Sequence, residues 1–200
     1  MKPLVSICIG LVFLMSCAQN KQSSLGETEF QREINSEYKD ASKSPLKEKN
    51  LITFEGLEFF RFDSAYVVKA TLKRTPDTKY FDMQTTTSRV SKERIFGILS
   101  FALKGKIYQL NVYQGKDLMA KEGFEDYLFL PFLDDTNGNE SYGGGRYIDL
   151  RIPEGDTLMV DFNSAYNPYC AYNEKYSCPI VPRENYLATE VRAGVKAFKK

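Results

Sequence analysis

Short segments in which apolar and polar residues alternate begin at Leu57 and continue almost to the end of the chain. The segment 66–74 (YVVKATLKR) shows the pattern, because every second position from Tyr66 to Leu72 is apolar. Successive side chains of a strand point to opposite faces, so this period of two indicates strands with one buried face. We expect strands at 57–62, 66–74, 79–86, 94–103, 107–113, 127–132, 146–152, 157–162 and 186–192.

The connections between most of these segments are short. Lys104-Gly105 lies between two of them and predicts a tight hairpin turn. Many short strands joined in this way are typical of an antiparallel β-sandwich or barrel. We therefore expect a mainly β fold of about nine strands in a β-domain over 57–196, within a single domain over 27–200.

A helical pattern precedes the strands. Thr28-Glu29-Phe30-Gln31 matches a capping box, and Phe30, Ile34, Tyr38 and Ala41 recur at helical spacing. These residues predict an amphipathic helix over 28–43, followed by a second helix over 45–52 that begins at Pro45. We interpret both helices as a lid packed on the β-domain, and a partner-binding helix is the alternative.

The first residues have the pattern of a bacterial lipoprotein leader. Lys2 precedes an apolar run that is too short to span a bilayer, and Leu14-Met15-Ser16-Cys17 resembles a lipobox. The pattern predicts a signal peptide over 1–16, lipid on Cys17 and a polar tether over 17–26. Ala18 favours the outer membrane, so we expect a chain anchored in the cell envelope through Cys17 and facing the periplasm.

The residue composition excludes several classes of function. The chain has no histidine, which excludes Ser-His-Asp and Cys-His hydrolases and HExxH zinc enzymes. It has 27 basic and 26 acidic residues, and this near-zero net charge gives no long-range attraction to a nucleic-acid partner. We expect no cofactor and no metal.

Two cysteines remain in the β-domain, Cys170 and Cys178. An even pair in an oxidising compartment predicts a disulfide. Two free thiols are the first alternative. A redox role is less favoured because the spacing is not CxxC and no fixed cation stands beside either cysteine in the sequence.

A glycine-rich loop over 133–145 (LDDTNGNESYGGG) interrupts the strand pattern. We interpret it mainly as a polar hairpin loop stabilised by Asx-turns. Calcium binding through Asp134, Asp135, Asn137, Asn139 and Glu140 is an alternative, although the spacing is not that of an EF-hand. Nucleotide binding is disfavoured because no Gly-Lys-Ser/Thr follows the glycines.

A second irregular stretch over 161–182 (DFNSAYNPYCAYNEKYSCPIVP) is rich in tyrosine, asparagine and proline. Such a composition builds either a rigid, self-satisfied loop or a face that binds sugars or peptides. We expect both loops to converge at one end of the domain. The predicted ligand-binding residues are Tyr142, Arg146, Asp161, Asn163, Tyr166, Asn167 and Tyr172.

Paired carboxylates are the remaining source of chemistry. Asp149 and Asp161 fall on neighbouring predicted strands, and Glu140 precedes them in the glycine-rich loop. Two carboxylates about 5–9 Å apart would resemble a glycosidase site. Asp149, Asp161 and Glu140 are therefore weak candidates for catalytic acids or bases, and a structural ion pair is the alternative for each aspartate.

The chain also resembles a bacterial family known as domain of unknown function 1684. The resemblance is carried by SPL and GLEFF at 44–46 and 56–60, LPFLDDTNGNESYGGGRYIDL at 130–150, DFNSAYNPYCAYNEKYSCPIVPRENYL at 161–187 and RAGVK at 192–196. It covers about 30–196 and implies no established activity. We expect an envelope binding module for a glycan, peptidoglycan fragment or peptide. The alternatives are a histidine-free hydrolase and a purely structural envelope protein.

Overall fold

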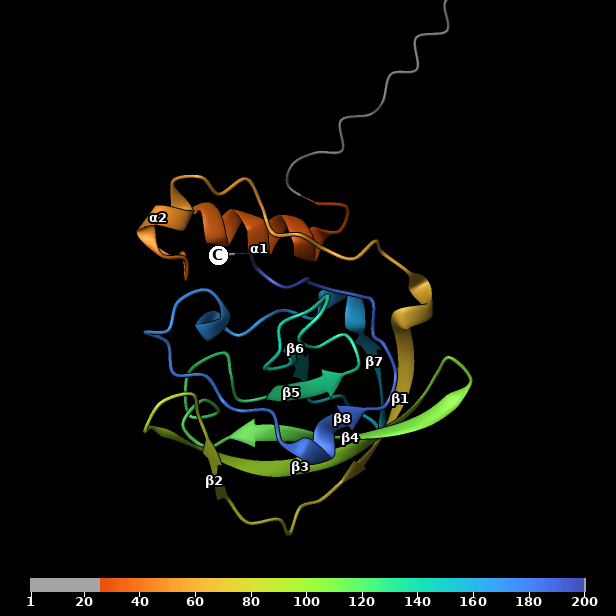
Figure 1. Ribbon diagram of the computed structural model, residues 1–200. Coiled ribbons are helices and arrows are strands. Elements are labelled where there is room, and N and C mark those ends of the chain that lie inside the picture. The colour runs from red at the N-terminus through yellow and green to blue at the C-terminus, as the bar shows by residue number, and fades with distance from the viewer. Residues whose placement is uncertain (1–25, 200) are drawn as a thin grey trace, which may run out of the picture.

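A computed structural model describes residues 26–199, and within them the fold is mainly β. Eight strands form one strongly curled sheet in the order β6-β5-β4-β3-β1-β7, with β2 beside β3 and β8 beside β5 (Figure 1). All pairs are antiparallel except β5 with β8. The strands are β1 (Val67–Arg74), β2 (Phe81–Gln84), β3 (Val90–Leu103), β4 (Lys106–Gly115), β5 (Tyr127–Asp134), β6 (Arg146–Arg151), β7 (Thr157–Asp161) and β8 (Tyr186–Leu187).

The predicted mainly β class is confirmed, but the sheet is a half-barrel and not a two-sheet sandwich. An isolated antiparallel bridge between Tyr147 and Tyr166 links β6 to the chain that follows β7. The predicted strand at 57–62 is wrong: this segment makes only one bridge, from Phe59 to Val195. Its neighbour is a short irregular segment near the C-terminus, which offers too few paired backbone groups for a ladder.

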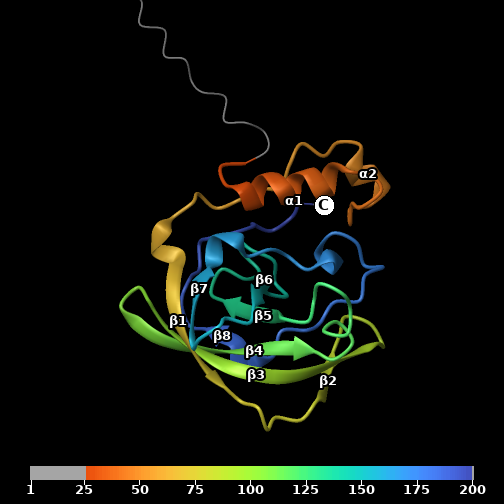
Figure 2. The same cartoon turned by 180° about the vertical axis from the view of Figure 1, so that it is seen from behind.

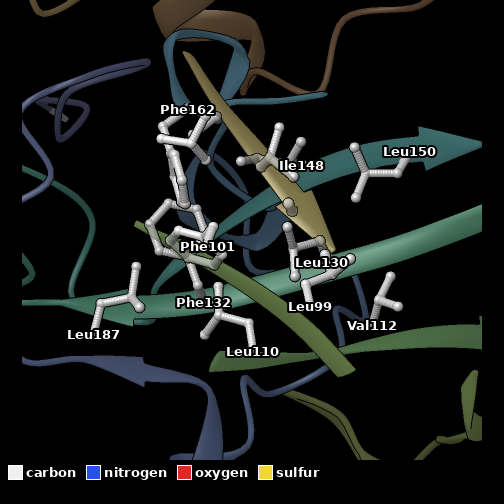
Figure 3. Packing of buried hydrophobic residues seen from close by; sticks show 14 of the residues in the cluster. Leu99, Phe101, Leu110, Val112, Leu130, Phe132, Ile148, Leu150, Phe162 and Leu187 are labelled. Atoms are coloured by element: carbon white, nitrogen blue, oxygen red, sulfur yellow. The ribbon is translucent and has the colours of Figure 1, made fainter. Parts of the chain in front are cut away.

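The hydrophobic core fills the inside of the curl. Alternate residues of β1, Val68, Ala70 and Leu72, are buried there, as the period of two predicts. Leu99, Phe101, Leu130, Ile148 and Phe162 converge from different parts of the chain (Figure 3). The predicted hairpin is confirmed, since Lys104 and Gly105 take positive φ angles of 50° and 76° between β3 and β4.

Helices α1 (Glu29–Lys39) and α2 (Glu48–Leu51) lie across the side of the molecule opposite β3 and β4 (Figures 1 and 2). The side chain of Thr28 accepts from the backbone N–H of Gln31 at 3.2 Å, so the capping residue is the predicted one. Helix α1 ends earlier than predicted because the Asp40 carboxylate accepts from Ser42 and starts a turn there. Helix α2 is likewise shorter than the predicted 45–52.

Helix α1 is fixed to the rest of the fold by a second apolar cluster. Ile34 and Tyr38 pack there with Tyr172 of the tyrosine-rich loop (residues 161–182) and with Val195 of the C-terminal segment (residues 188–199). No helix within residues 26–199 is long and apolar enough to cross a membrane. The predicted leader and the lipid-bearing Cys17 lie outside the described residues.

Candidate functional site

A groove with a volume of about 450 Å³ lies between α1 and the tyrosine-rich loop. We call it the α1 groove. Helix α1 contributes Phe30, Glu33 and Glu37 to its wall. Strand β6 and the loop contribute Tyr147, Asp149, Tyr166, Tyr169, Tyr176 and Cys178.

Aromatic contacts set the distance between α1 and the loop. The ring of Tyr38 meets the ring of Tyr172 edge to face at 5.0 Å and that of Tyr169 at 6.1 Å. The Tyr169 hydroxyl donates to Glu37 Oε1 at 2.9 Å across the groove. Because edge-to-face packing fixes ring orientation, these contacts hold the groove open at a defined width.

Asp149 is the best-organised polar group of the α1 groove. The hydroxyls of Tyr166 and Tyr127 both donate to its Oδ1 atom, at 2.5 and 2.7 Å. Burial, and then the Asp149 carboxylate itself, raise the pKa of both phenols well above its ordinary value. Both tyrosines therefore remain hydrogen-bond donors at neutral pH. Asp149 is solvent-exposed, so its second oxygen is available to a ligand.

The charge of the groove is one-sided. Three carboxylates line it, those of Glu33, Glu37 and Asp149, and no lysine or arginine does so among the described residues. Tyrosine faces beside carboxylates favour cationic groups and hydroxyl-rich groups over anions.

Of the predicted ligand-binding residues, Tyr166 lines the groove and Tyr142 lies close to it. Tyr142 is half-buried, packs against the cluster beneath α1, and places its hydroxyl 3.9 Å from Cys170 Sγ. Burial is the main cause that raises the pKa of Tyr142 to about 12. The two predicted loops therefore do converge, as expected.

The prediction for Arg146 is corrected by its burial. Its side chain has no exposed surface and forms an ion pair with Asp134 at 2.7 Å. The guanidinium also donates to the backbone carbonyls of Val191 and Ala193. A buried arginine needs such partners, and here they leave none of its surface for a ligand.

Tyr172 and Asn167 are also buried and do not line the groove. The Asn167 amide donates to the carbonyl of Lys196 at 2.8 Å and to the Tyr172 hydroxyl at 3.3 Å. These side chains hold the loop to α1 and to the C-terminal segment. They belong to the self-satisfied half of the loop, which was the alternative interpretation of its composition.

Asp161 and Asn163 organise the start of the same loop. Asp161 caps the turn η2 (Phe162–Ser164) by accepting from the backbone N–H of Asn163 at 2.8 Å. Asn163 is buried, and its amide bonds both backbone groups of Asp63, at 3.0 and 3.1 Å. Both residues therefore fix the backbone and are not in the groove.

The three carboxylates predicted as catalytic candidates are not brought together. Asp149 lines the α1 groove, Asp161 caps η2, and Glu140 pairs with Arg192 at 3.0 Å. Strands β6 and β7 lie at the two ends of the sheet order and are not neighbours. Glu33 and Glu37 are the carboxylates that accompany Asp149 in the groove.

Both cysteines are free thiols in the structure, so the expected disulfide is not formed in it. They nevertheless lie side by side, because the backbone N–H of Cys170 donates to Cys178 Sγ at 3.1 Å. A hydrogen bond from the Cys178 thiol is the main cause that lowers the pKa of Cys170 to about 6, and the Tyr142 hydroxyl adds to it. The same contact raises the pKa of Cys178.

The carboxylate oxygens of the glycine-rich loop are not arranged to bind a metal ion. Asp134 Oδ1 accepts from the backbone and the hydroxyl of Thr136 at 2.9 and 2.6 Å, so its oxygens serve the loop itself. Among residues 26–199, no group of three or more Cys, Asp or Glu side chains could hold a metal ion. The loop is the self-bonded polar hairpin that was our main interpretation.

Sequence reasoning missed the contribution of α1 to the groove. Glu33 and Glu37 stand one turn apart on the predicted amphipathic helix, but we did not include them among the candidate residues. Tyr147, Tyr169 and Tyr176 were also outside the predicted set. The spacing of the two glutamates was the available signal, and only the packing of α1 on the loop gives it a meaning.

Comparisons with known proteins agree with this fold. The solution NMR structure of an uncharacterized protein from Haloarcula marismortui is 34% identical, with a TM-score of 0.66. The match covers 82% of this chain and 88% of that one. None of the curated proteins matches this chain. The profile described as "Protein of unknown function (DUF1684)" matches residues 52–196, and the chain therefore belongs to the DUF1684 family.

Proposed function

We propose that this protein is a binding module of the bacterial cell envelope that takes a glycan, a peptidoglycan fragment or a peptide into the α1 groove. The observation that carries the proposal is the arrangement of Asp149. Its Oδ1 atom is held by Tyr166 and Tyr127, and the carboxylate faces an aromatic groove with no basic residue in its described lining. Preorganised polar groups on an apolar wall are typical of ligand sites.

The groove favours ligands that carry an amino group or several hydroxyls. A carboxylate that already accepts hydrogen bonds from two phenol hydroxyls has a fixed orientation. Its exposed oxygen can accept a further hydrogen bond from a ligand N–H or O–H. The faces of Tyr169 and Tyr176 offer stacking surfaces beside it.

Titration of the purified full-length chain in detergent with three probes tests the proposal. The probes are tetra-alanine, N,N′-diacetylchitobiose and muramyl dipeptide, and heat or chemical-shift change is measured. Asp149→Asn should lower the affinity for a bound probe about 10- to 100-fold, the loss expected for one charge-assisted hydrogen bond. Glu154→Gln, an exposed carboxylate outside the groove, is the matched control. Failure of all three probes to bind would overturn the proposal.

A second candidate function is hydrolysis of the same ligand. It is favoured by the presence of Asp149, Glu33 and Glu37 in one groove, which provides carboxylates for acid and base roles. The same titrations, followed by mass spectrometry of the probes, decide between the functions. Intact probes after long incubation would leave binding alone.

We also propose that the chain is a lipoprotein anchored through Cys17 and placed in the outer membrane facing the periplasm. The lipobox-like sequence at 14–17 supports this. Cells grown with radiolabelled palmitate should label the wild-type chain and not the Cys17→Ser variant. Recovery of the unlabelled wild-type chain in the soluble fraction would contradict the anchor.

A further inference from the structure

A second cavity, with a volume of about 310 Å³, adjoins the α1 groove. We call it the β3 pocket, because Glu93 of β3 lies in its wall. Tyr147, Tyr166 and Pro179 line both cavities, so the two share a wall. A ligand longer than a single residue could contact both sides of this wall at once.

Glu93 is an unusual residue for a strand interior. Its side chain is only 5% exposed, and one oxygen, Oε1, accepts from the Ser91 hydroxyl at 2.7 Å. The other oxygen, Oε2, is buried and has no hydrogen-bond partner among the described residues. Buried polar atoms in native proteins almost always have a partner, so an unpartnered oxygen at a cavity wall points to a group supplied from outside.

The sheet is built to accommodate this carboxyl. Gly115 stands opposite Glu93 in the β3–β4 register. A Cβ atom at Gly115 would lie 3.0 Å from Oε1 and 3.2 Å from Oε2, closer than ordinary packing allows. Burial is the main cause that raises the pKa of Glu93, which favours the protonated form. In that form the carboxyl can donate a hydrogen bond.

The rim of the β3 pocket is basic, in contrast to the α1 groove. Arg89, Lys92 and Lys121 line it, together with the single exposed acid Asp117. Lys92 is paired with Asp82, whereas Arg89 and Lys121 have no carboxylate partner within 4.0 Å in the described part of the chain. Arg89 is held in place by Ser177, which accepts from Nε and Nη2 at 3.0 Å each.

We propose that one peptide-like ligand spans the shared wall, with a free amino group in the α1 groove and a free carboxylate in the β3 pocket. The carboxylates of the α1 groove suit the amino group, and Arg89 and Lys121 suit the carboxylate. The Glu93 carboxyl completes the second subsite by bonding to the ligand carboxylate. This inference rests on the proposed binding function and selects a peptide over a neutral glycan.

Blocking each end of one probe tests the two subsites separately. Tetra-alanine, its N-acetyl form and its C-terminal amide are titrated into the full-length chain. Each blocked form should bind about 10- to 100-fold more weakly than tetra-alanine, because each loses one charge-assisted interaction. The Lys121→Gln variant should weaken tetra-alanine about tenfold and leave the amide unchanged.

A second subsite variant and a control variant distinguish a loss of binding from a loss of folding. Arg89→Gln should show the same selectivity as Lys121→Gln, and it also removes contacts to Ser177, so Lys121→Gln is the cleaner variant. Lys106→Gln, at the exposed β3–β4 hairpin, is the matched control and should change neither affinity.

The outcomes separate this inference from the proposed function. If the amide binds as tightly as the acid while N-acetylation still weakens binding, the β3 pocket is not a subsite and the binding module stands. If N,N′-diacetylchitobiose binds and no tetra-alanine form does, the peptide class is wrong and the binding module stands. If no probe binds, both proposals fail.

Discussion

The glycine-rich loop and the tyrosine-rich loop look alike in sequence and differ in the structure. Both are irregular, polar segments between strands, and both contained residues that we expected to bind a ligand. The first loop directs its polar groups inward to one another. The second has one face that does the same and another face that borders the α1 groove.

In the glycine-rich loop, the Thr136 hydroxyl lies 2.7 Å from that of Ser141, and Asn137 donates to Ser141 at 2.8 Å. Arg146 directly follows this loop, and its ion pair with Asp134 crosses the base of the loop. Each of these side chains finds its partner within the loop or in the C-terminal segment. The loop therefore works as a brace of the fold.

In the tyrosine-rich loop, neighbouring residues have opposite roles. Tyr172 is fully buried beneath α1, whereas Tyr169 and Tyr176 are half-buried and line the groove. Both kinds of tyrosine occur in one short sequence. The difference teaches that composition identifies an irregular loop, and that the element packed on it, here α1, decides which of its side chains a ligand can reach.

The largest expected effect is a loss of stability when the ion pair at the base of the glycine-rich loop is removed. Asp134→Ala should lower the free energy of unfolding by about 3–5 kcal/mol, because it leaves the buried Arg146 guanidinium without its counter-charge. Chemical denaturation with an unchanged slope measures the loss. Glu140→Ala is the matched control, since its pair with Arg192 is about half exposed and contributes less than about 1 kcal/mol. Equal losses for both variants would refute the bracing role of Asp134.

The next effect concerns two glycines of the same loop that take left-handed backbone angles. Gly145 has a φ of 87°, and a Cβ atom there would lie 2.6 Å from the Phe132 carbonyl oxygen. Gly145→Ala should therefore cost about 2–4 kcal/mol, from left-handed backbone strain together with overpacking. Gly138 has a φ of 84° and no heavy atom within 4 Å of such a Cβ, so Gly138→Ala should cost about 1–2 kcal/mol. Thermal unfolding of both variants measures the difference.

Much of the fold could be predicted because it depends on local patterns. The alternation in β1 and the Lys104-Gly105 turn each determine their own structure. The Thr28 cap fixes the start of α1 in the same way. The segment 57–62 is short and aromatic, as many strands are, yet it lacks a regular neighbour to pair with. Strand formation needs both a suitable local sequence and a regular neighbouring strand, and the sequence of the segment itself shows only the local requirement.

The candidate site was less predictable because it depends on contacts between distant segments. Asp149 and Tyr166 could be selected from their residue types, and the structure places them in one groove. In the sequence Arg146 cannot be told from a ligand-binding arginine. In the structure its guanidinium is bonded to Asp134 and to backbone carbonyls of the C-terminal segment. Glu37 was overlooked because its partner Tyr169 is 132 residues away.

Within the tyrosine-rich loop, a smaller change tests the groove face. Tyr166→Phe removes the hydroxyl that donates to Asp149 and should cost about 1 kcal/mol of stability. It should also weaken ligand binding, because Asp149 keeps only Tyr127 as a donor. Tyr176→Phe is the control, since its hydroxyl has no hydrogen-bond partner in the described structure. Binding that is equally weakened in both variants would show that orientation of Asp149 is unimportant.

The last prediction concerns the pH dependence at Cys170, where the two loops meet. The lowered pKa of about 6 predicts that Cys170 reacts with iodoacetamide half-maximally near pH 6, while Cys178 stays unreactive until a higher pH. Because the folded pKa lies below the ordinary value of 9.0, stability should rise with pH through the interval between them. Alkylation followed by intact-mass measurement gives the profile.

The Tyr142→Phe variant relates this profile to the loop contact. It removes the hydroxyl 3.9 Å from Cys170 Sγ, which helps to lower the pKa of that thiol, and should therefore move the reactivity midpoint of Cys170 to higher pH. The predicted disulfide between Cys170 and Cys178 is tested by alkylating protein that has been purified from the cell envelope without reductant. If neither cysteine is alkylated until reductant is added, the adjacent thiols have been oxidised in the cell. If Cys170 is alkylated at once, the pair is a free dithiol, and Cys178 is its member in the wall of the α1 groove.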